Sequence, residues 1–311
     1  MLPIVCSSSL LVMSSDPFID LASSTEAFAE EFREFMTRNP HPAPGSPADK
    51  EAQGELLAGD WSEHPSGEIF ATTYLTATSC TDHLLGLADV LRAHNALFAA
   101  YTLTRGAVEA AALGCYLTEQ DIDGRERVRR TMNYRLDAMC AQVWLFTDMQ
   151  SDYATERLDE TKLRIADFAR AARQHNFSFH GMNGKGRAAH IGPVQPAAMN
   201  LISLAVDKDL PELGRTYQRL LSATAHSGLH GLARMLTPLS PNEGRPGEAL
   251  AAVNIDPRTL AVDLVVGPLT AHHLARGIEW FTGCDMTGLH GPANQMLRTW
   301  ARIGQIDVPT G

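Results

Sequence analysis

The fold of this chain is decided by residues 70–117, FATTYLTATSCTDHLLGLADVLRAHNALFAAYTLTRGAVEAAALGCYL. Apolar residues recur there at intervals of three and four, the spacing of an amphipathic helix. They are Leu84, Leu87, Val90 and Leu91 and, more loosely, Leu97, Tyr101, Val108, Ala112 and Cys115. The pattern predicts two long helices with a break near His94-Asn95. The second is rich in alanine, which allows neighbouring helices to pack closely.

Similar patterns on both sides of this stretch predict an all-α helical bundle. Capping signals at Ser23-Ser24-Thr25-Glu26 and at Asp123 with Glu126 open two further helices. Asp256-Pro257 is a third start signal, because proline is favoured at the first helical position. The expected helices cover residues 28–38, 125–146, 153–174, 196–204, 209–236, 259–281 with an interruption at Gly267-Pro268, and 291–302. Weak strand patterns occur only in stretches such as 251–255 and 260–266.

Proline- and glycine-rich segments suggest how the chain is divided. We expect a flexible lead over residues 1–22 and an N-terminal helix with a Pro/Gly-rich loop over 23–69. The bundle core would span 70–236, and C-terminal helices would pack on it over 237–311. Trp61 is expected to dock its loop on the core. Residues 177–196 carry several glycines and prolines and are expected to form a long loop, which is often functional in a compact domain.

Composition restricts the cellular setting and the class of partner. The chain has 311 residues, 44% hydrophobic residues and a formal charge of -10. That charge argues against non-specific nucleic-acid binding, although a local basic patch remains compatible with it. Five cysteines without a Cys-x-x-Cys pair indicate free thiols in a reducing cytoplasm. The sequence has no secretory signal pattern and no apolar run of membrane-spanning length, so a cytoplasmic protein is expected.

The stretch YQRLLSATAH, residues 217–226, contains the most informative polar pattern. Arg219, Ser222 and His226 are spaced by three and four residues and therefore share one stripe of a helix. Tyr217 lies at the start of the same stretch. Apolar residues flank the stripe, so its polar groups need partners wherever they are buried.

A second polar pair lies in the alanine-rich helix of the opening stretch. Arg105 and Glu109 are one turn apart, and buried charges have to be paired. We expect Glu109 to pair with His226 or with an arginine of the cluster Arg125, Arg127, Arg129 and Arg130. A purely structural interpretation is that these groups form a buried hydrogen-bond network.

These motifs support a family resemblance. The order TRGAVEAAALGCYLTE, RERVRR, GPVQPAAMNLI and YQRLLSATAHSGLHGL resembles a group of uncharacterised bacterial helical proteins. That group shares an Arg-x-x-x-Glu helix, an arginine-rich helix start and a late helix of the Tyr-x-x-x-Ser-x-x-x-His kind. The likeness covers roughly residues 70–236. In this chain four residues separate Tyr217 from Ser222.

The group in turn distantly resembles HEPN helical bundles, RNA-cleaving proteins with an Arg-x(4 to 6)-His motif. Arg219 and His226 have six residues between them, and Leu220 stands where HEPN proteins usually have a polar residue. The resemblance implies metal-independent RNA cleavage in defence or stress response, without a cofactor, at a site completed in a homodimer. His226 would be the general acid or base, and Arg219 would stabilise phosphate charge. Glu109 would be a third catalytic residue. Arg105, Tyr217, Ser222 and Asp82 would support substrate binding.

Two other functions remain open. A small-molecule tailoring or cyclising enzyme of specialised metabolism could use the same polar cavity. Asp82 with Asp89, and Asp148 with Asp152, could hold magnesium for a diphosphate substrate, but the aspartate-rich signature of terpene cyclases is absent. The other alternative is a non-enzymatic helical interaction module.

Histidines and loop cations give weaker signals. His175, His180 and His190 lie around the glycine-rich loop without metal-ligand spacing, and solvated loop histidines are expected. Asp148 is expected to cap the helix that starts near Tyr153. Lys185 and Arg187 could contact an anionic ligand, although the loop lacks a complete phosphate-binding motif.

Overall fold

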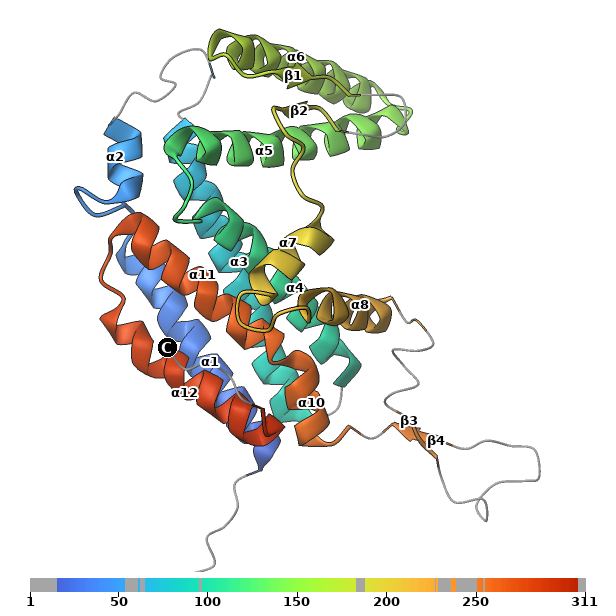
Figure 1. The fold of residues 1–311 in the computed structure, drawn as a ribbon. Helices are drawn as coiled ribbons and strands as arrows, with labels where there is room; N and C mark the ends of the chain where they lie inside the picture. Colours follow the sequence, from blue (N-terminus) through green and yellow to red (C-terminus); the bar gives the residue numbers. More distant parts are fainter. Residues whose placement is uncertain are drawn as a thin grey trace, which may run out of the picture.

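A computed structural model describes residues 16–53, 61, 65–94, 97–182, 188–226, 228, 236–238, 251–253 and 255–306. Most of them are helical, which confirms the predicted all-α bundle (Figure 1). The helices are α1 (Pro17–Arg38), α2 (Pro47–Gln53), α3 (Pro65–Ala93), α4 (Leu97–Leu117), α5 (Gly124–Thr147), α6 (Asp152–Gln174), α7 (Ala198–Val206), α8 (Gly214–Ala225), α10 (Pro257–Leu264), α11 (Val266–Thr282) and α12 (Thr287–Gly304). Two short antiparallel pairs join β1 (Phe179–His180) to β2 (His190–Ile191) and β3 (Leu236–Pro238) to β4 (Ala251–Val253).

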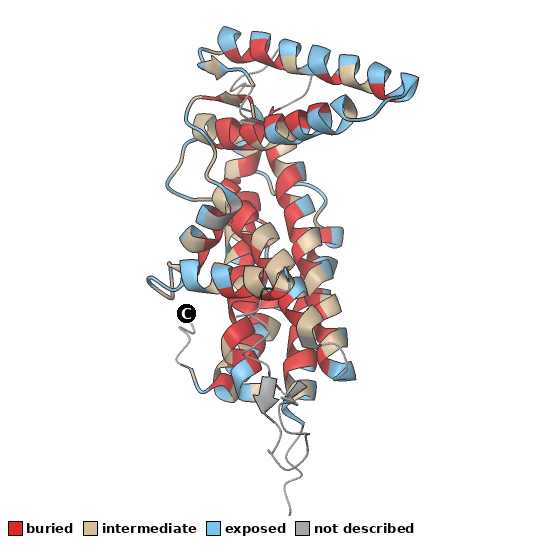
Figure 2. Ribbon diagram, turned by 90° about the vertical axis from the view of Figure 1, so that its right-hand side faces the viewer, coloured by how far each residue is buried: buried red, intermediate tan, exposed pale blue. Residues whose placement is uncertain are grey.

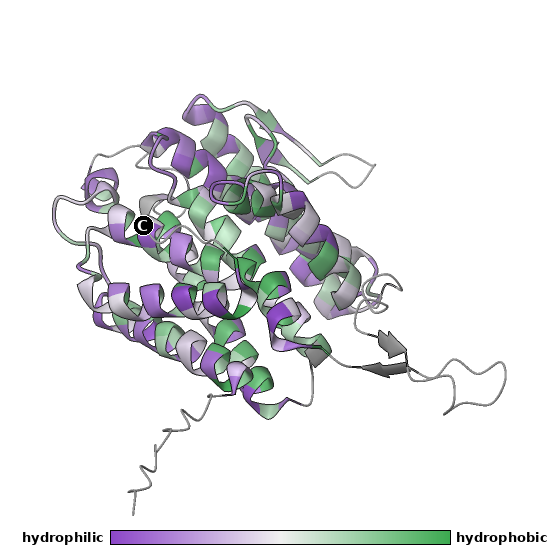
Figure 3. Ribbon diagram, turned by 60° about the horizontal axis from the view of Figure 1, so that its bottom comes forward, coloured by the Kyte–Doolittle hydropathy of each residue, from purple (hydrophilic) through white to green (hydrophobic). Residues whose placement is uncertain are grey.

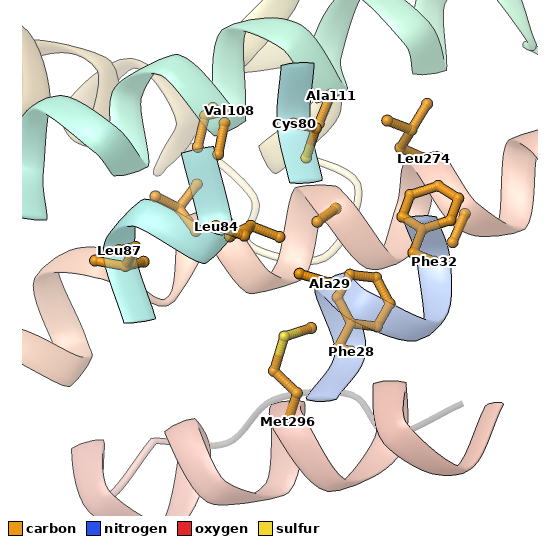
Figure 4. Packing of buried hydrophobic residues seen from close by; sticks show 14 of the residues in the cluster. Phe28, Ala29, Phe32, Cys80, Leu84, Leu87, Val108, Ala111, Leu274 and Met296 are labelled. Carbon is orange, nitrogen blue, oxygen red and sulfur yellow. The ribbon is translucent and has the colours of Figure 1, made fainter. Parts of the chain in front are cut away.

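The main core lies between the two helices of the opening stretch and their neighbours. Helices α3 and α4 pack against each other, α1 covers α3, and α11 covers α4, while α12 lies against α1. Their apolar faces meet in one buried cluster, to which α1 contributes Phe28 and Phe32 and α12 contributes Met296 (Figure 4). Burial is greatest along these inward faces, whereas outward faces are polar (Figures 2 and 3). The predicted break near residue 94 is confirmed, and His94 has a positive φ of 54°.

Small residues on α4 let the helices approach closely, as its composition predicted. A Cβ atom on Gly114 would lie 2.3 Å from Leu274 Cδ1 and 2.8 Å from Thr76 Oγ1. Both distances are shorter than van der Waals contact, so α3 and α11 pack there against bare backbone.

A second, smaller core forms where α5 and α6 cross the end of the bundle (Figure 1). The β1–β2 hairpin pairs Phe179 with Ile191 and lies against α5 and α6. Trp61 is buried in this core and stacks on His175 with ring centroids 5.4 Å apart. The predicted docking of Trp61 is therefore confirmed.

The first helix starts earlier than predicted. Its N-cap is Asp16, whose carboxylate accepts from the Phe18 amide, and residues 17–22 form helix rather than a flexible lead. Ser24 and Thr25 are buried inside the helix and donate to the Leu21 carbonyl oxygen. The predicted capping box was wrong because Asp16 followed by Pro17 is the stronger start signal. Residues 1–15 lie outside the described residues.

Other boundaries also differ from the prediction. Helix α8 ends at Ala225 rather than near Leu236, which lies in β3. Residues 260–266 are helical instead of extended, with a break at Val265, because the Asp256 cap starts α10 and its apolar side chains are buried in the bundle. Ser151, not Asp148, caps α6, and Asp148 instead ends α5.

The predicted Asp123 cap is confirmed, since its carboxylate accepts from the Glu126 amide. The expected long loop over 177–196 contains the β1–β2 hairpin, and residues 183–187 lie outside the described residues. Of the two expected strand stretches, the one beginning at Ala251 forms β4. Among the described helices, none combines the length and hydrophobicity needed to cross a membrane.

Candidate functional site

The packing of α4 against α8 creates a cluster of four polar side chains. On α4, Arg105 Nε donates to Glu109 Oε1 at 2.8 Å across one turn of the helix. The Arg105 side chain is 24% exposed and that of Glu109 is 38% exposed. The pair is therefore partly open to solvent rather than buried.

The end of α8 supplies the other two members. Arg105 Nη1 lies 2.8 Å from His226 Nε2 and 3.4 Å from Ser222 Oγ. His226 is the C-cap residue of α8 and is exposed, while Ser222 is half-buried. We call Arg105, Glu109, Ser222 and His226 the α4–α8 cluster.

The contact between Arg105 and His226 fixes how protons are distributed. A guanidinium can only donate, so His226 Nε2 must accept. The neutral imidazole then carries its proton on Nδ1. In this arrangement an imidazole nitrogen that accepts a hydrogen bond lies directly beside a fixed positive charge.

Glu109 has a different partner from either of those predicted. We expected it to contact His226 or the arginine-rich start of α5. Instead, Arg105 lies between the carboxylate and the imidazole. Side chains four residues apart on a helix are neighbours on its surface. Arg105 can therefore pair with Glu109 without any help from another element.

Arg219, the predicted partner of His226, is not part of the cluster. It is exposed on α8, and within the described residues it has no hydrogen bond or ion pair. The stripe exists as a helical face, but the guanidinium that contacts the histidine comes from α4. A single helix pattern could not reveal this, because the contact joins residues 121 positions apart.

Two further predicted site residues have other positions. Tyr217 donates its hydroxyl to the Val262 carbonyl oxygen at 2.9 Å and so fixes α8 to α10. Burial, together with the nearby Asp263 carboxylate, raises the pKa of Tyr217. Asp82 is exposed on α3 and makes no hydrogen bond to the cluster in the described part of the chain. Asp89, the other possible magnesium ligand on this helix, pairs with Arg92.

The arginine-rich start of α5 is structural. The side chains of Arg127, Arg129 and Arg130 are nearly buried and bind carboxylates and backbone carbonyl groups. Glu126 binds both Arg129 and Arg130, and these hydrogen bonds lower the pKa of its carboxyl. These three cations are therefore not available as a surface for nucleic acid.

One residue beside the cluster was missed by sequence reasoning. The ring of His83, on α3, lies against Gly106, where an added Cβ would be 2.4 Å from its Nε2. Only a glycine leaves room for the ring at this point of α4. The sequence signal for this close approach was a glycine in the middle of a strongly predicted helix, where glycine usually has a packing reason.

Glu109 also lines a pocket of about 320 Å³. It is bounded by α4, α5, the hairpin and the segment before α7. Its lining residues are Glu109, Leu113, Asn133, Tyr134, Asp137, residues 188–190, residues 194–197 and Leu201. Sequence reasoning missed Tyr134, Asp137 and Gln195, because α5 supplies the first two and the distant segment before α7 supplies the third.

The remaining histidines and aspartates that the structure describes do not gather into a metal site. In the described ranges, no group of three or more His, Cys, Asp or Glu side chains is placed to hold a metal ion. His180 and His190 stack across the hairpin with centroids 4.6 Å apart. His273 binds Asp209 on the α11 side. Lys185 and Arg187 lie outside the described residues.

Comparisons of the chain with protein-family models, curated proteins and solved structures found no match. The HEPN-like relationship therefore stays a prediction that depends on the motifs described above.

Proposed function

We propose that the protein cleaves RNA phosphodiester bonds without a metal ion, using the α4–α8 cluster as its active site. One observation carries this proposal: a guanidinium fixed by a carboxylate contacts the basic nitrogen of an exposed imidazole. Phosphodiester transfer requires a general base and a cation for the developing phosphate charge, and Arg105 and His226 supply both.

The resting contact also suggests an order of events. A bound phosphate competes for Arg105, because a guanidinium binds phosphate through paired hydrogen bonds. Its movement toward the phosphate frees His226 Nε2 beside the scissile group. Nε2 then takes the 2′-hydroxyl proton, and the 2′-oxygen attacks phosphorus and forms a 2′,3′-cyclic phosphate. The leaving 5′-oxygen takes a proton from water or from an imidazolium of a second copy.

Glu109 and Ser222 orient the cation in this scheme. Glu109 holds Nε, so the guanidinium is directed toward α8. Ser222 receives a weaker hydrogen bond from the same nitrogen that contacts the imidazole. Neither group has to exchange a proton with the substrate.

The face of α8 offers a local attraction for a negatively charged strand. Arg215 and Arg219 are both exposed on this helix, which leads to the cluster. They would contact backbone phosphates on either side of the scissile one, despite the overall charge of -10. In this proposal Arg219 binds substrate, and Arg105 acts on the reacting phosphate.

The test compares His226→Ala with His290→Ala, which removes another exposed histidine from α12. A labelled single-stranded RNA is incubated with each variant, with and without EDTA. We expect His226→Ala to lose about 10²- to 10⁴-fold in rate. His290→Ala and EDTA should leave the rate unchanged. The proposal fails if His226→Ala degrades RNA as fast as the parent.

Arg105→Lys tests the guanidinium. Lysine keeps the charge but loses the planar pair of donors, so the cleavage rate should fall while the helical circular dichroism spectrum stays the same. An Arg105→Lys protein with the parental rate would exclude Arg105 as the phosphate-binding group.

The pocket beside Glu109 supports a second candidate, a small-molecule enzyme. Its volume of about 320 Å³ lies in the range of ligand sites, and it combines apolar walls with a few polar groups. In that case Glu109 and its neighbours would act on a molecule held in the pocket. Retention of small-molecule turnover by a variant that no longer cleaves RNA would favour this candidate.

A further inference from the structure

The pocket between α4, α5 and the hairpin has an unusual balance of polar groups. Its apolar wall is formed by Leu113, Val194, Pro196, Leu201 and several alanines. Alongside them are two carboxylates, two side-chain amides, one phenol and one imidazole. Neither lysine nor arginine is among the described residues that line it.

Several of these polar groups still have free hydrogen-bonding capacity. Gln195 Oε1 is buried and has no hydrogen-bond partner in the described part of the structure. Asp137 is exposed at the pocket and, within the same part, has no hydrogen bond or ion pair. Glu109 uses one oxygen for Arg105, and its other oxygen has no partner among the described groups. All three offer acceptors.

The remaining amide has a structural role. Asn133 is buried, donates to the carbonyl oxygens of Ile191 and Pro193, and accepts from the Ile191 amide. It fixes the hairpin as one wall of the pocket. Its donors are therefore not available to a ligand.

The nearby cations that the structure describes are also occupied. Arg129 and Arg130 bind Glu126 and backbone carbonyl groups, and Arg105 points toward α8. Among the described groups, no cation pairs with Asp137, and Glu109 keeps one oxygen unpaired beside its ion pair with Arg105. An anionic ligand would meet the Asp137 carboxylate, and no cation among the described lining residues would compensate that repulsion.

We propose that this pocket binds a small organic molecule that carries a protonated amine. The ammonium would lie between Asp137 and Glu109 and donate to Gln195 Oε1, while its hydrocarbon part contacts Leu113 and Leu201. An ammonium donates up to three hydrogen bonds, which matches these three acceptors. A divalent metal fits less well, because calcium takes six to eight oxygen ligands and magnesium six.

The site is adjacent to the α4–α8 cluster and shares Glu109 with it, yet the proposal does not depend on RNA cleavage. Asp137 lies in the pocket alone and takes no part in the cleavage scheme. A substitution there separates the two proposals.

Binding is measured by isothermal titration calorimetry with cyclohexylamine, cyclohexanol and cyclohexanecarboxylate, three probes of similar shape and different charge. We expect cyclohexylamine to bind with a dissociation constant on the order of millimolar. The alcohol should bind at least several-fold more weakly, and the carboxylate should not bind. Equal binding of amine and alcohol, or no binding of the amine, would overturn the proposal.

Two variants locate the site. Asp137→Asn keeps the volume, removes the charge and should weaken cyclohexylamine binding by about three- to tenfold. Asp159→Asn, an exposed carboxylate on α6, is the matched control and should bind as the parent does. Ala197→Leu adds bulk at an exposed lining position and should also weaken binding. Parental affinity in Asp137→Asn would refute the assignment, whereas RNA cleavage by Asp137→Asn should be unchanged.

Discussion

Arg127 is the buried cation that joins the end of α4 to the start of α5, and we predict that Arg127→Met strongly destabilises the fold. Its side chain is 1% exposed. Nη1 donates to the carbonyl oxygens of Leu117 and Glu119 at 2.6 and 3.0 Å, and Nη2 to that of Ile122 at 3.3 Å. Nε donates to Glu51 Oε1 at 3.1 Å. Methionine fills similar space and removes all four donations.

The cost follows from what is left without a partner. Each buried carbonyl that loses its donor costs about 1 to 3 kcal/mol, less where water can reach it. Glu51 adds little of its own, because burial raises its pKa more than the attraction of Arg127 lowers it. Because three carbonyl groups lose their donor, we expect a loss of about 3 to 5 kcal/mol in the free energy of unfolding.

Urea denaturation followed by far-ultraviolet circular dichroism measures the change. Arg170→Met is the control, because Arg170 is a 65% exposed cation on α6 whose ion pair with Asp167 should contribute less than about 1 kcal/mol. The reasoning is refuted if Arg127→Met loses less than about 1 kcal/mol, or no more than Arg170→Met.

Three further outcomes are expected. Gly114→Ala should destabilise the fold by about 1 to 3 kcal/mol, because its methyl group would overlap side chains of α3 and α11. Gly291→Ala, in the open first turns of α12, should be neutral or stabilising. Equal changes in melting temperature for the two variants would contradict this. Burial and nearby positive groups lower the pKa of His272 to about 4, so the unfolded chain binds more protons between pH 4 and 6.5. Stability should therefore fall as pH decreases through that window, and His272→Gln should show a flatter pH profile. Asn133→Leu should leave the Ile191 amide without its acceptor, lower the free energy of unfolding by about 1 to 3 kcal/mol and speed hydrogen exchange at that amide. Unchanged exchange would contradict the role of Asn133 in fixing the hairpin.

Local patterns were sufficient for most of the helical architecture. The three- and four-residue spacing gave α3 and α4 with their break, and the Asp123 and Asp256 caps gave the starts of α5 and α10. These features depend on neighbouring residues only. Where two local signals competed, as at Asp16 and Ser23, the weaker one gave a wrong boundary.

The sequence by itself determined that this chain is a helical bundle with a polar stripe at the end of one helix and an Arg–Glu pair in another. Only the tertiary structure decided that Arg105, rather than Arg219, contacts His226, and that Glu109 also borders a pocket. Helical periodicity specifies the face on which a side chain lies. It does not specify which other helix that face will meet, because that depends on how all the apolar surfaces are buried together.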